Sequence, residues 1–257
     1  MRKLPLAPLL LAVPLLFAAS APAFAQIPGV GGSIPDLSSL LPAGEGSASG
    51  RIVQLIALLT VMSVAPGLLI MVTSFTRIVV ALSFLRSGIG LQTTPANLIL
   101  ISLALFMTFY VMAPTFDRAW TDGVLPLTRN EISEEVAFAK ISDPFRDFMV
   151  QRVRDKDLKL FDDLAAEHLG IKTEDGATPL RVLIPAFMIS ELRRGFEIGF
   201  LIALPFLVID MIVATLTMSM GMMMLPPTVL SLPFKVLFFV LIDGWNMLVG
   251  GLVRSFF

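Results

Sequence analysis

The sequence predicts an all-α membrane protein in which two long, kinked helical hairpins flank a small helical segment outside the cytoplasm. Of the 257 residues, 56% are hydrophobic and only 15% are charged, and the mean hydropathy is +0.84. Soluble domains carry about 25% charged residues, so this composition places the chain in a membrane. The apolar residues gather in four segments, at 52–72, 98–112, 198–218 and 229–249. Prolines inside or beside such segments predict kinks, at Pro66, Pro185, Pro205 and Pro233.

The N-terminal 25 residues have the pattern of a cleavable signal peptide. Arg2 and Lys3 precede an apolar run, and Ala-Phe-Ala at 23–25 is a small-x-small cleavage pattern. We expect cleavage after Ala25, which leaves residues 26–51, rich in Gly, Ser and Pro, as a flexible lead outside the cytoplasm. The alternative is an uncleaved first transmembrane helix, which the short length of the run disfavours.

Residues 52–116 form the first predicted hydrophobic hairpin. Two of the four apolar segments, at 52–72 and 198–218, are long enough to cross a hydrocarbon core. With the mature N-terminus outside, the connection that carries Arg77 and Arg86 falls in the cytoplasm, which agrees with the preference for positive charge on that side.

Residues 117–185 form a polar segment that we expect to fold outside the cytoplasm as small packed helices. Thr-Arg-Asn-Glu at 128–131 is a candidate capping box, and Asp143 before Pro144 is a candidate helix start. Gly170 is a candidate helix terminator. The charges of both signs in this segment are interspersed, which is typical of a solvated face.

Residues 186–257 form the second hydrophobic hairpin, and its connection is the sequence Met-Gly-Met-Met-Met-Leu-Pro-Pro at 220–227. Methionine side chains are unbranched and polarizable, so they can fill an irregular gap and deform around a passing object. Two interpretations of this loop are open: a deformable seal, and a hydrophobic turn in which methionine only packs.

Ionisable residues lie inside or beside the second pair of apolar segments, at Glu191, Arg193, Arg194, Glu197, Asp210, Lys235 and Asp243. Charges at such depth face protein or water, not lipid. Helical spacing predicts an Arg193–Glu197 pair and a Glu191–Arg194 pair. A pair between helices would need Asp210 to meet Lys235. Two roles are open for the set: buried ion pairs that hold subunits in register, and a proton or ion relay.

No motif predicts catalysis, a metal or a cofactor. The single histidine, His168, lies in the polar segment, and cysteine is absent, which excludes disulfides and thiolate metal sites. The sequence contains no phosphate-binding loop, dinucleotide fingerprint or H-E-x-x-H zinc motif. The net charge of −1 without a basic cluster argues against nucleic-acid binding. We therefore expect a protein that is not an enzyme.

Several of these segments together resemble one known family. The resemblance lies in Pro-Ala-Phe-Met-Ile-Ser-Glu-Leu-Arg-Arg-Gly-Phe-Glu-Ile-Gly-Phe at 185–200, 204–210, the methionine-rich 220–227, 231–235 and 243–245, and upstream in 73–77, 82–86 and 92–97. These segments closely resemble the FliP family, subunits of the export gate of the flagellar type III secretion apparatus. The family's more usual sequence at 92–97 has a second proline.

The resemblance implies a function and partners. FliP-like proteins assemble in several copies with FliQ and FliR into a helical, conical gate, beside other membrane proteins of the export apparatus. It implies a pore-forming subunit at the flagellar basal body, multi-pass in the bacterial inner membrane, through which unfolded flagellar subunits leave the cytoplasm. In that gate the four apolar segments need not be ordinary transmembrane helices.

The residues expected to form the gate are Gly221, Met222, Met223, Met224, Pro226 and Pro227. Methionines of several copies would converge to a ring that seals against small ions yet yields to a passing chain. The charged set from Glu191 to Asp243 is expected to serve assembly. Two alternatives remain: the homologous gate of a virulence-type secretion system, and a small secondary transporter or ion channel with Asp210, Lys235 and Asp243 as its relay.

Overall fold

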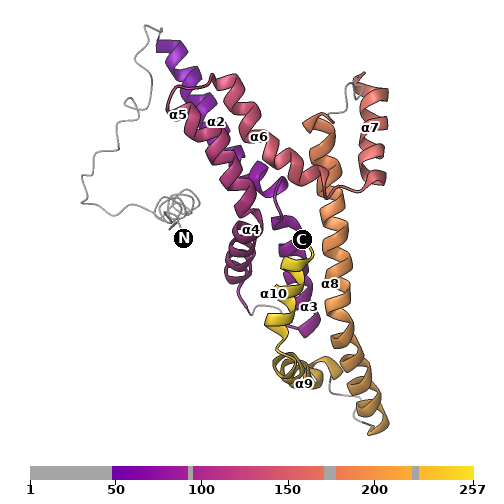
Figure 1. Cartoon of the computed structure of the whole chain (residues 1–257). Coiled ribbons are helices and arrows are strands. Elements are labelled where there is room, and N and C mark those ends of the chain that lie inside the picture. The colour runs from indigo at the N-terminus through magenta and orange to yellow at the C-terminus, as the bar shows by residue number, and fades with distance from the viewer. Residues whose placement is uncertain (1–47, 92–94, 171–177, 222–225) are drawn as a thin grey trace, which may run out of the picture. The chain divides into compact units, whose positions relative to one another are not determined.

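The computed structural model describes residues 48–91, 95–170, 178–221 and 226–257. They form helices and no strand, so the predicted all-α class is confirmed (Figure 1). The helices are α2 (Ala48–Met71), α3 (Phe75–Ile89), α4 (Asn97–Ala119), the π-helix η2 (Trp120–Val124), α5 (Leu125–Thr128), α6 (Glu134–Val150), α7 (Asp155–Leu169), α8 (Leu180–Ser219), α9 (Pro227–Leu241) and α10 (Gly244–Arg254). The chain divides into two units, Met1–Gln54 and Leu55–Phe257, and all contacts below lie within the second unit.

Two described helical stretches are long and apolar enough to cross a membrane. They are Asn97–Thr128, with a mean hydropathy of 2.0, and Leu180–Ser219, with a mean hydropathy of 2.4. Two further candidates are bent pairs of helices. Met62–Met71 meets Phe75–Ile89 at 72°, and α9 meets α10 at 65°. The described part of the chain therefore offers between two and four candidate spans.

The prolines do not break the helices that contain them. Helix α8 runs for 40 residues through Pro185 and Pro205, and α9 contains Pro233. A proline removes one backbone hydrogen bond, which a long helix tolerates when its remaining turns are intact. The two sharp bends lie elsewhere, at 72–74 and at 242–243. At the second bend Asp243 adopts a left-handed conformation with φ 50°, which ends one helix and starts the next.

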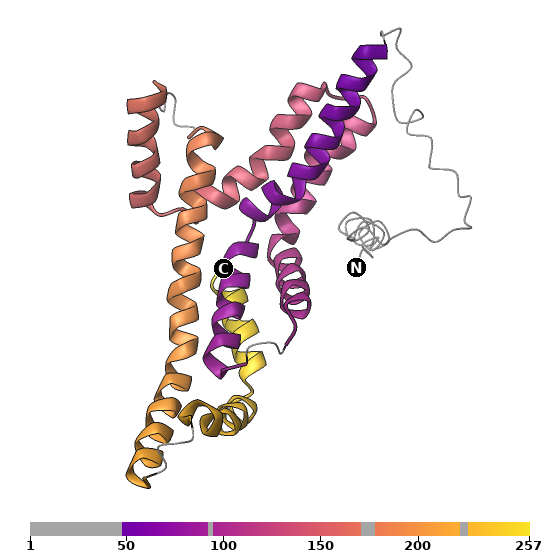
Figure 2. The same cartoon turned by 180° about the vertical axis from the view of Figure 1, so that it is seen from behind.

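The connection in the first predicted hairpin is itself a helix, α3, and it packs lengthwise against α8 (Figures 1 and 2). The close approach depends on glycines four residues apart on α8. A Cβ atom at Gly199 would lie 2.6 Å from the ring of Phe84, and one at Gly195 would lie 3.1 Å from Val80. Small residues at this spacing let two helix backbones approach. Helix α3 is thus part of the core, and Arg77 within it is buried, not in an exposed connection.

The polar segment folds into the short helices that the sequence predicts, but their starts differ. Thr128 ends α5, and α6 begins after Ser133, whose hydroxyl accepts a hydrogen bond from the backbone N–H of Val136. The predicted capping box at 128–131 is therefore wrong. Pro144 lies inside α6, not at a helix start. Gly170 does end α7, in a left-handed conformation with φ 62°.

Candidate functional site

A buried ion pair joins α3 to α8. Arg77 is 1% exposed and Glu191 is 0% exposed. Arg77 Nε donates to Glu191 Oε2 at 2.8 Å, and Nη2 donates to Oε1 at 2.5 Å. Two parallel N–H donors match two carboxylate oxygens, so the pair is fixed in orientation as well as position. The partners are 114 residues apart in sequence, so this pair locks together the two helices that make the core.

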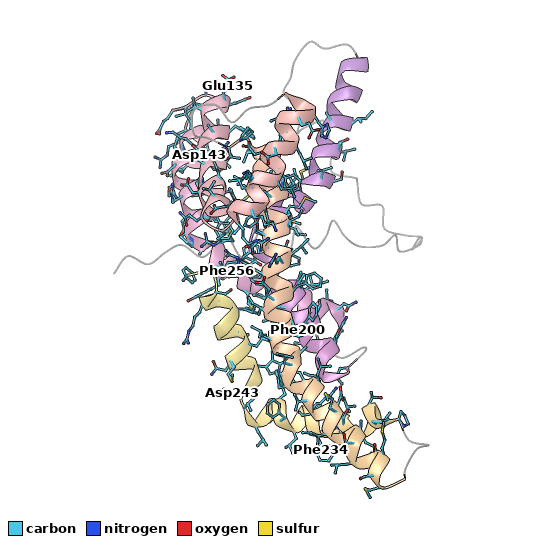
Figure 3. All side chains as sticks on the ribbon, turned by 90° about the vertical axis from the view of Figure 1, so that its right-hand side faces the viewer. Glu135, Asp143, Phe200, Phe234, Asp243 and Phe256 are labelled. Carbon is cyan, nitrogen blue, oxygen red and sulfur yellow. The ribbon has the colours of Figure 1, made fainter. Side chains whose placement is uncertain are left out.

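The remaining donors of Arg77 hold the residues after α10. Nη1 donates to the Ser255 carbonyl at 2.9 Å and to its hydroxyl at 3.1 Å. The guanidinium carbon lies 3.8 Å from the centroid of the Phe256 ring, a cation–π contact. Figure 3 labels Phe256 beyond the end of α10 and Asp243 at the bend where that helix starts. One side chain therefore ties α3, α8 and the residues after α10 into a unit.

Arg152, in the turn between α6 and α7, adds a second contact to the same residues. Its Nη2 donates to the Phe256 carbonyl at 2.8 Å, and its Nη1 donates to the Phe148 carbonyl at 3.1 Å. Burial lowers the pKa of Arg152, and the charges of Arg77 and Arg194 lower it further, against the opposing effect of Glu191. Its Nε is buried with no hydrogen-bond partner.

A third polar contact fixes α7 on α8. The buried Ser190 hydroxyl donates to Asp157 Oδ2 at 2.6 Å and accepts from the Arg154 backbone N–H at 3.1 Å. Arg154 also donates twice to the Asp157 carboxylate, at 2.7 and 2.8 Å. These hydrogen bonds, first from Arg154 and then from Ser190, hold the pKa of Asp157 below its usual range despite burial.

The charged residues at the start of α8 are arranged only partly as predicted. Arg193 and Glu197 do pair, at 2.8 Å, but they are 56% and 58% exposed in the subunit. The predicted pair of Glu191 with Arg194 is wrong, because Glu191 faces α3 and binds Arg77. Asp243 is also exposed, where it accepts a hydrogen bond from Asn246 at 3.1 Å. Arg193, Glu197 and Asp243 are therefore not buried charges of the subunit, since each points out from the helix contacts.

Asp210 and Lys235 meet across α8 and α9, at 2.6 Å. The Ser231 hydroxyl donates to the other oxygen of Asp210 at 2.5 Å, and Lys235 Nζ donates to the Gly88 carbonyl at 3.1 Å. Lys235 is 5% exposed and Asp210 is 29% exposed. The ammonium group thus lies at the C-terminal end of α3, where helix carbonyls favour a positive charge. This cluster fixes the α8–α9 hairpin onto α3.

An apolar groove of about 640 Å³ lies between α8 and α9. Its lining includes Ile209, Val213, Leu216, Met220, Val229 and Phe234. Gly221, after α8, has a left-handed φ of 73°, and Pro226 and Pro227 start α9. Met222, Met223 and Met224 lie outside the described residues.

The described residues contain no group of three or more His, Cys, Asp or Glu side chains that could hold a metal ion. His168 is exposed in the last turn of α7. The polar clusters are occupied by arginine–carboxylate and lysine–carboxylate pairs, which suits them to fixing helices together.

A model described as the FliP family matches residues 58–252. The chain belongs to the FliP family. The flagellar biosynthetic protein FliP of Rhizobium meliloti is 68% identical over 212 residues, which cover 82% of this chain and 86% of the relative. The protein of the same name from Bacillus subtilis is 52% identical, over 79% of this chain and 91% of the relative. Members of the FliP family are components of the flagellar export apparatus, and the apolar helices make this chain a membrane protein of that apparatus.

No local pattern in the sequence marks Arg152, Ser255 or Phe256, because the hydrogen bonds that join Arg152 to Phe256 and Arg77 to Ser255 connect residues distant in the chain. The G-x-x-x-G spacing of Gly195 and Gly199 was a usable signal. In this chain it marks the face of α8 that α3 covers.

Proposed function

We propose that this FliP-family chain is a pore-forming subunit of the flagellar export gate, which assembles in several copies with FliQ and FliR and passes unfolded flagellar subunits across the inner membrane. This proposal rests on an apolar face of α8 that the described residues of its own chain leave uncovered. That face includes Phe196, Phe200, Leu201, Leu207, Met211 and Met218, all exposed. A continuous apolar face of this length marks a contact with lipid or with another subunit.

The polar contacts of the hairpin support a gate at its tip. Lys235 and Asp210 anchor α8 and α9 to each other and to the end of α3. The anchor fixes α8 and α9, the two helices that flank residues 222–225, relative to the core of the subunit. In several copies, Met222, Met223 and Met224 would then converge and form a deformable seal. Gly221 permits the tight turn, and Pro226 with Pro227 stiffens the start of α9.

We assign structural roles to the charged residues of this proposal. Arg77–Glu191 holds the subunit together, and the exposed Arg193–Glu197 pair is available to neighbouring subunits. For Asp210 the rival role is an ion relay. The hydrogen bonds from Ser231 and Lys235 already satisfy both of its oxygens, which supports an anchor. The relatives described above are flagellar, which favours the flagellar branch over a virulence-type one.

The domain boundaries follow the same proposal. Residues 1–25 act as a signal peptide and 26–51 as a lead, and both lie almost wholly outside the described residues. Residues 52–116 and 186–257 supply the two hydrophobic hairpins. Residues 117–185 then lie outside the cytoplasm, and the chain crosses the inner membrane more than once at the basal body.

The test is a strain in which Met222, Met223 and Met224 are all replaced by Ala. We expect increased leakage of small ions through assembled complexes, because Ala is too short to close the ring. Secretion of flagellar subunits is measured in the same cells. The control replaces three exposed methionines outside both the loop and that face of α8, Met62, Met71 and Met247. Normal leakage with normal secretion in the loop variant would remove the methionines from the mechanism.

The transporter alternative is tested by Asp210→Asn. A gate subunit should lose assembly or secretion, whereas a secondary transporter should stay assembled and lose ion movement coupled to its substrate.

A further inference from the structure

The ionic cluster around α7 and α8 contains more arginines than carboxylates. Three arginines are paired within the subunit: Arg77 with Glu191, Arg154 with Asp157, and Arg193 with Glu197. Arg152 and Arg194 lie in the same cluster, and within the described part of the chain neither has a carboxylate partner. Five arginines against three carboxylates leave an excess charge of +2 among the described residues of the cluster.

This excess cannot be removed by deprotonation. Guanidinium groups stay charged in proteins, and both arginines are partly buried. Arg194 lies close enough to Arg77 and Arg152 for the three charges to repel one another. A partly buried charge is costly unless an opposite charge neutralises it. Among the residues that the structure describes, the cluster therefore lacks carboxylates for two arginines, and a neighbouring molecule can supply them.

Helix α7 carries a complementary excess on its exposed side. Positions 155, 159, 163 and 167 are four residues apart, so they share one face of the helix, and all four are exposed: Asp155, Lys159, Asp163 and Glu167. Lys156, also exposed, falls between Asp163 and Glu167 on the same face, so three carboxylates and two amines give this stripe a charge of −1. Among the described residues, none of the four has a hydrogen-bond or ion-pair partner in its side chain. Leu160 and Leu164 lie beside the stripe and are 50% and 40% exposed.

The acidic stripe faces away from the α8 of its own chain. Asp157 contacts Ser190 on α8, and at about 100° per residue the centre of the stripe lies on the opposite side of α7. Arg194 is therefore not neutralised by α7 of its own subunit. A second copy of the chain can supply the stripe, together with leucines that match Leu201, which is exposed two turns after Arg194 on the same face of α8.

We propose that Arg194, with Arg152 beside it, binds the acidic stripe of α7 in a neighbouring copy of this chain. The contact brings the carboxylates of one subunit to the two unpaired arginines of the next. It joins two different faces, so it propagates from copy to copy around an assembly. This inference rests on the proposed assembly of several copies.

The first test is charge reversal. In Arg194→Glu the repulsion with Arg77 and Arg152 is relieved, so thermal unfolding of the detergent-solubilised subunit should occur at the same or a higher temperature. Co-purification of two differently tagged copies, expressed together, should fall by about tenfold or more, as for loss of a desolvated interfacial charge pair. When Asp163→Arg and Glu167→Arg are added to the Arg194→Glu chain, the charges are again opposite, and co-purification of the two copies should be restored. A merely structural role of Arg194 would lower stability and association together.

The second test uses the absence of native cysteine. One tagged copy carries Arg194→Cys and the other carries Asp163→Cys or Glu167→Cys, and we expect an oxidised heterodimer. The matched control is Arg193→Cys, because Arg193 is the neighbouring residue and already has a partner in Glu197.

The outcomes separate the two proposals. If wild-type copies do not co-purify at all, the proposed assembly fails. If they do, but Arg194→Glu associates normally and no cross-link forms, this inference alone is overturned. It is also overturned if Arg194→Glu leaves association intact and instead weakens binding to phosphatidylglycerol vesicles, since the anion is then a lipid phosphate.

Discussion

Arg77 and Glu191 form a doubly hydrogen-bonded ion pair that is closed to solvent, with Nε–Oε2 and Nη2–Oε1 distances of 2.8 and 2.5 Å. The pair joins α3 to α8, and the third nitrogen of Arg77 binds Ser255 after α10. The guanidinium group of Arg77 therefore joins α3, α8 and the residues after α10.

Removal of one partner of the buried pair should destabilise the subunit more than removal of both. Glu191→Leu leaves an uncompensated buried charge and should lower the free energy of unfolding by about 3–5 kcal/mol. The double variant Arg77→Met, Glu191→Leu leaves none, and its loss should be smaller. Thermal unfolding of the detergent-solubilised subunit measures both. A double variant at least as unstable as Glu191→Leu would contradict this account.

Phe256 should contribute far more to stability than the adjacent Phe257. Phe256 is buried beneath the Arg77 guanidinium, whereas Phe257 is 80% exposed. Phe256→Ala should lower the free energy of unfolding by about 3–5 kcal/mol. Phe257→Ala should change it by less than about 0.5 kcal/mol. Protease sensitivity of α10 is the measurement, and equal sensitivity of the two variants would refute the contact.

Gly199→Ala should weaken the packing of α3 on α8. The new Cβ would lie 2.6 Å from the Phe84 ring, so one helix must shift, at a cost of about 1–3 kcal/mol in the free energy of unfolding. The control is Gly251→Ala in α10, where a Cβ meets nothing within 4 Å. That change should be neutral or stabilising by up to about 1 kcal/mol. Thermal unfolding of both variants would show opposite signs, and matching losses would exclude a steric cause.

Asp157 should make the attachment of α7 sensitive to acid. Its pKa is lower in the folded than in the unfolded chain, first because of the hydrogen bonds from Arg154. Such a group stabilises the fold fully above its unfolded pKa of about 3.9, and the contribution is lost as the pH falls through the folded pKa. We expect proteolysis of α7 by an acid-active protease to increase below about pH 4.

The matched pair of variants isolates that carboxylate. Asp157→Asn should make α7 more sensitive at pH 6 and should flatten the dependence on pH. Asp163→Asn changes an exposed carboxylate of the same helix and should keep the wild-type dependence. If Asp157→Asn retains the full acid response, another group causes it.

Sequence patterns predicted the elements better than they predicted the contacts. The helical stop at Gly170 and the Arg193–Glu197 pair are local features, and both are present. The start of α6 was wrong because Ser133 competes with Thr128 as a cap, and only the packing of the turn decides between them. Helix α3 was predicted as a connection between spans because its arginines lower its hydropathy, although Arg77 is buried once Glu191 faces it.

By itself, the sequence determined that this chain is helical, apolar and a member of the FliP family, because composition, periodicity and family motifs are properties of neighbouring residues. The tertiary structure alone decided which charges pair. Glu191 has Arg194 within one turn, yet it binds Arg77, 114 residues away. The buried face of α8, which carries Glu191, points to α3. An unpaired charge on that buried face costs far more free energy than a missing ion pair on the exposed side of the helix.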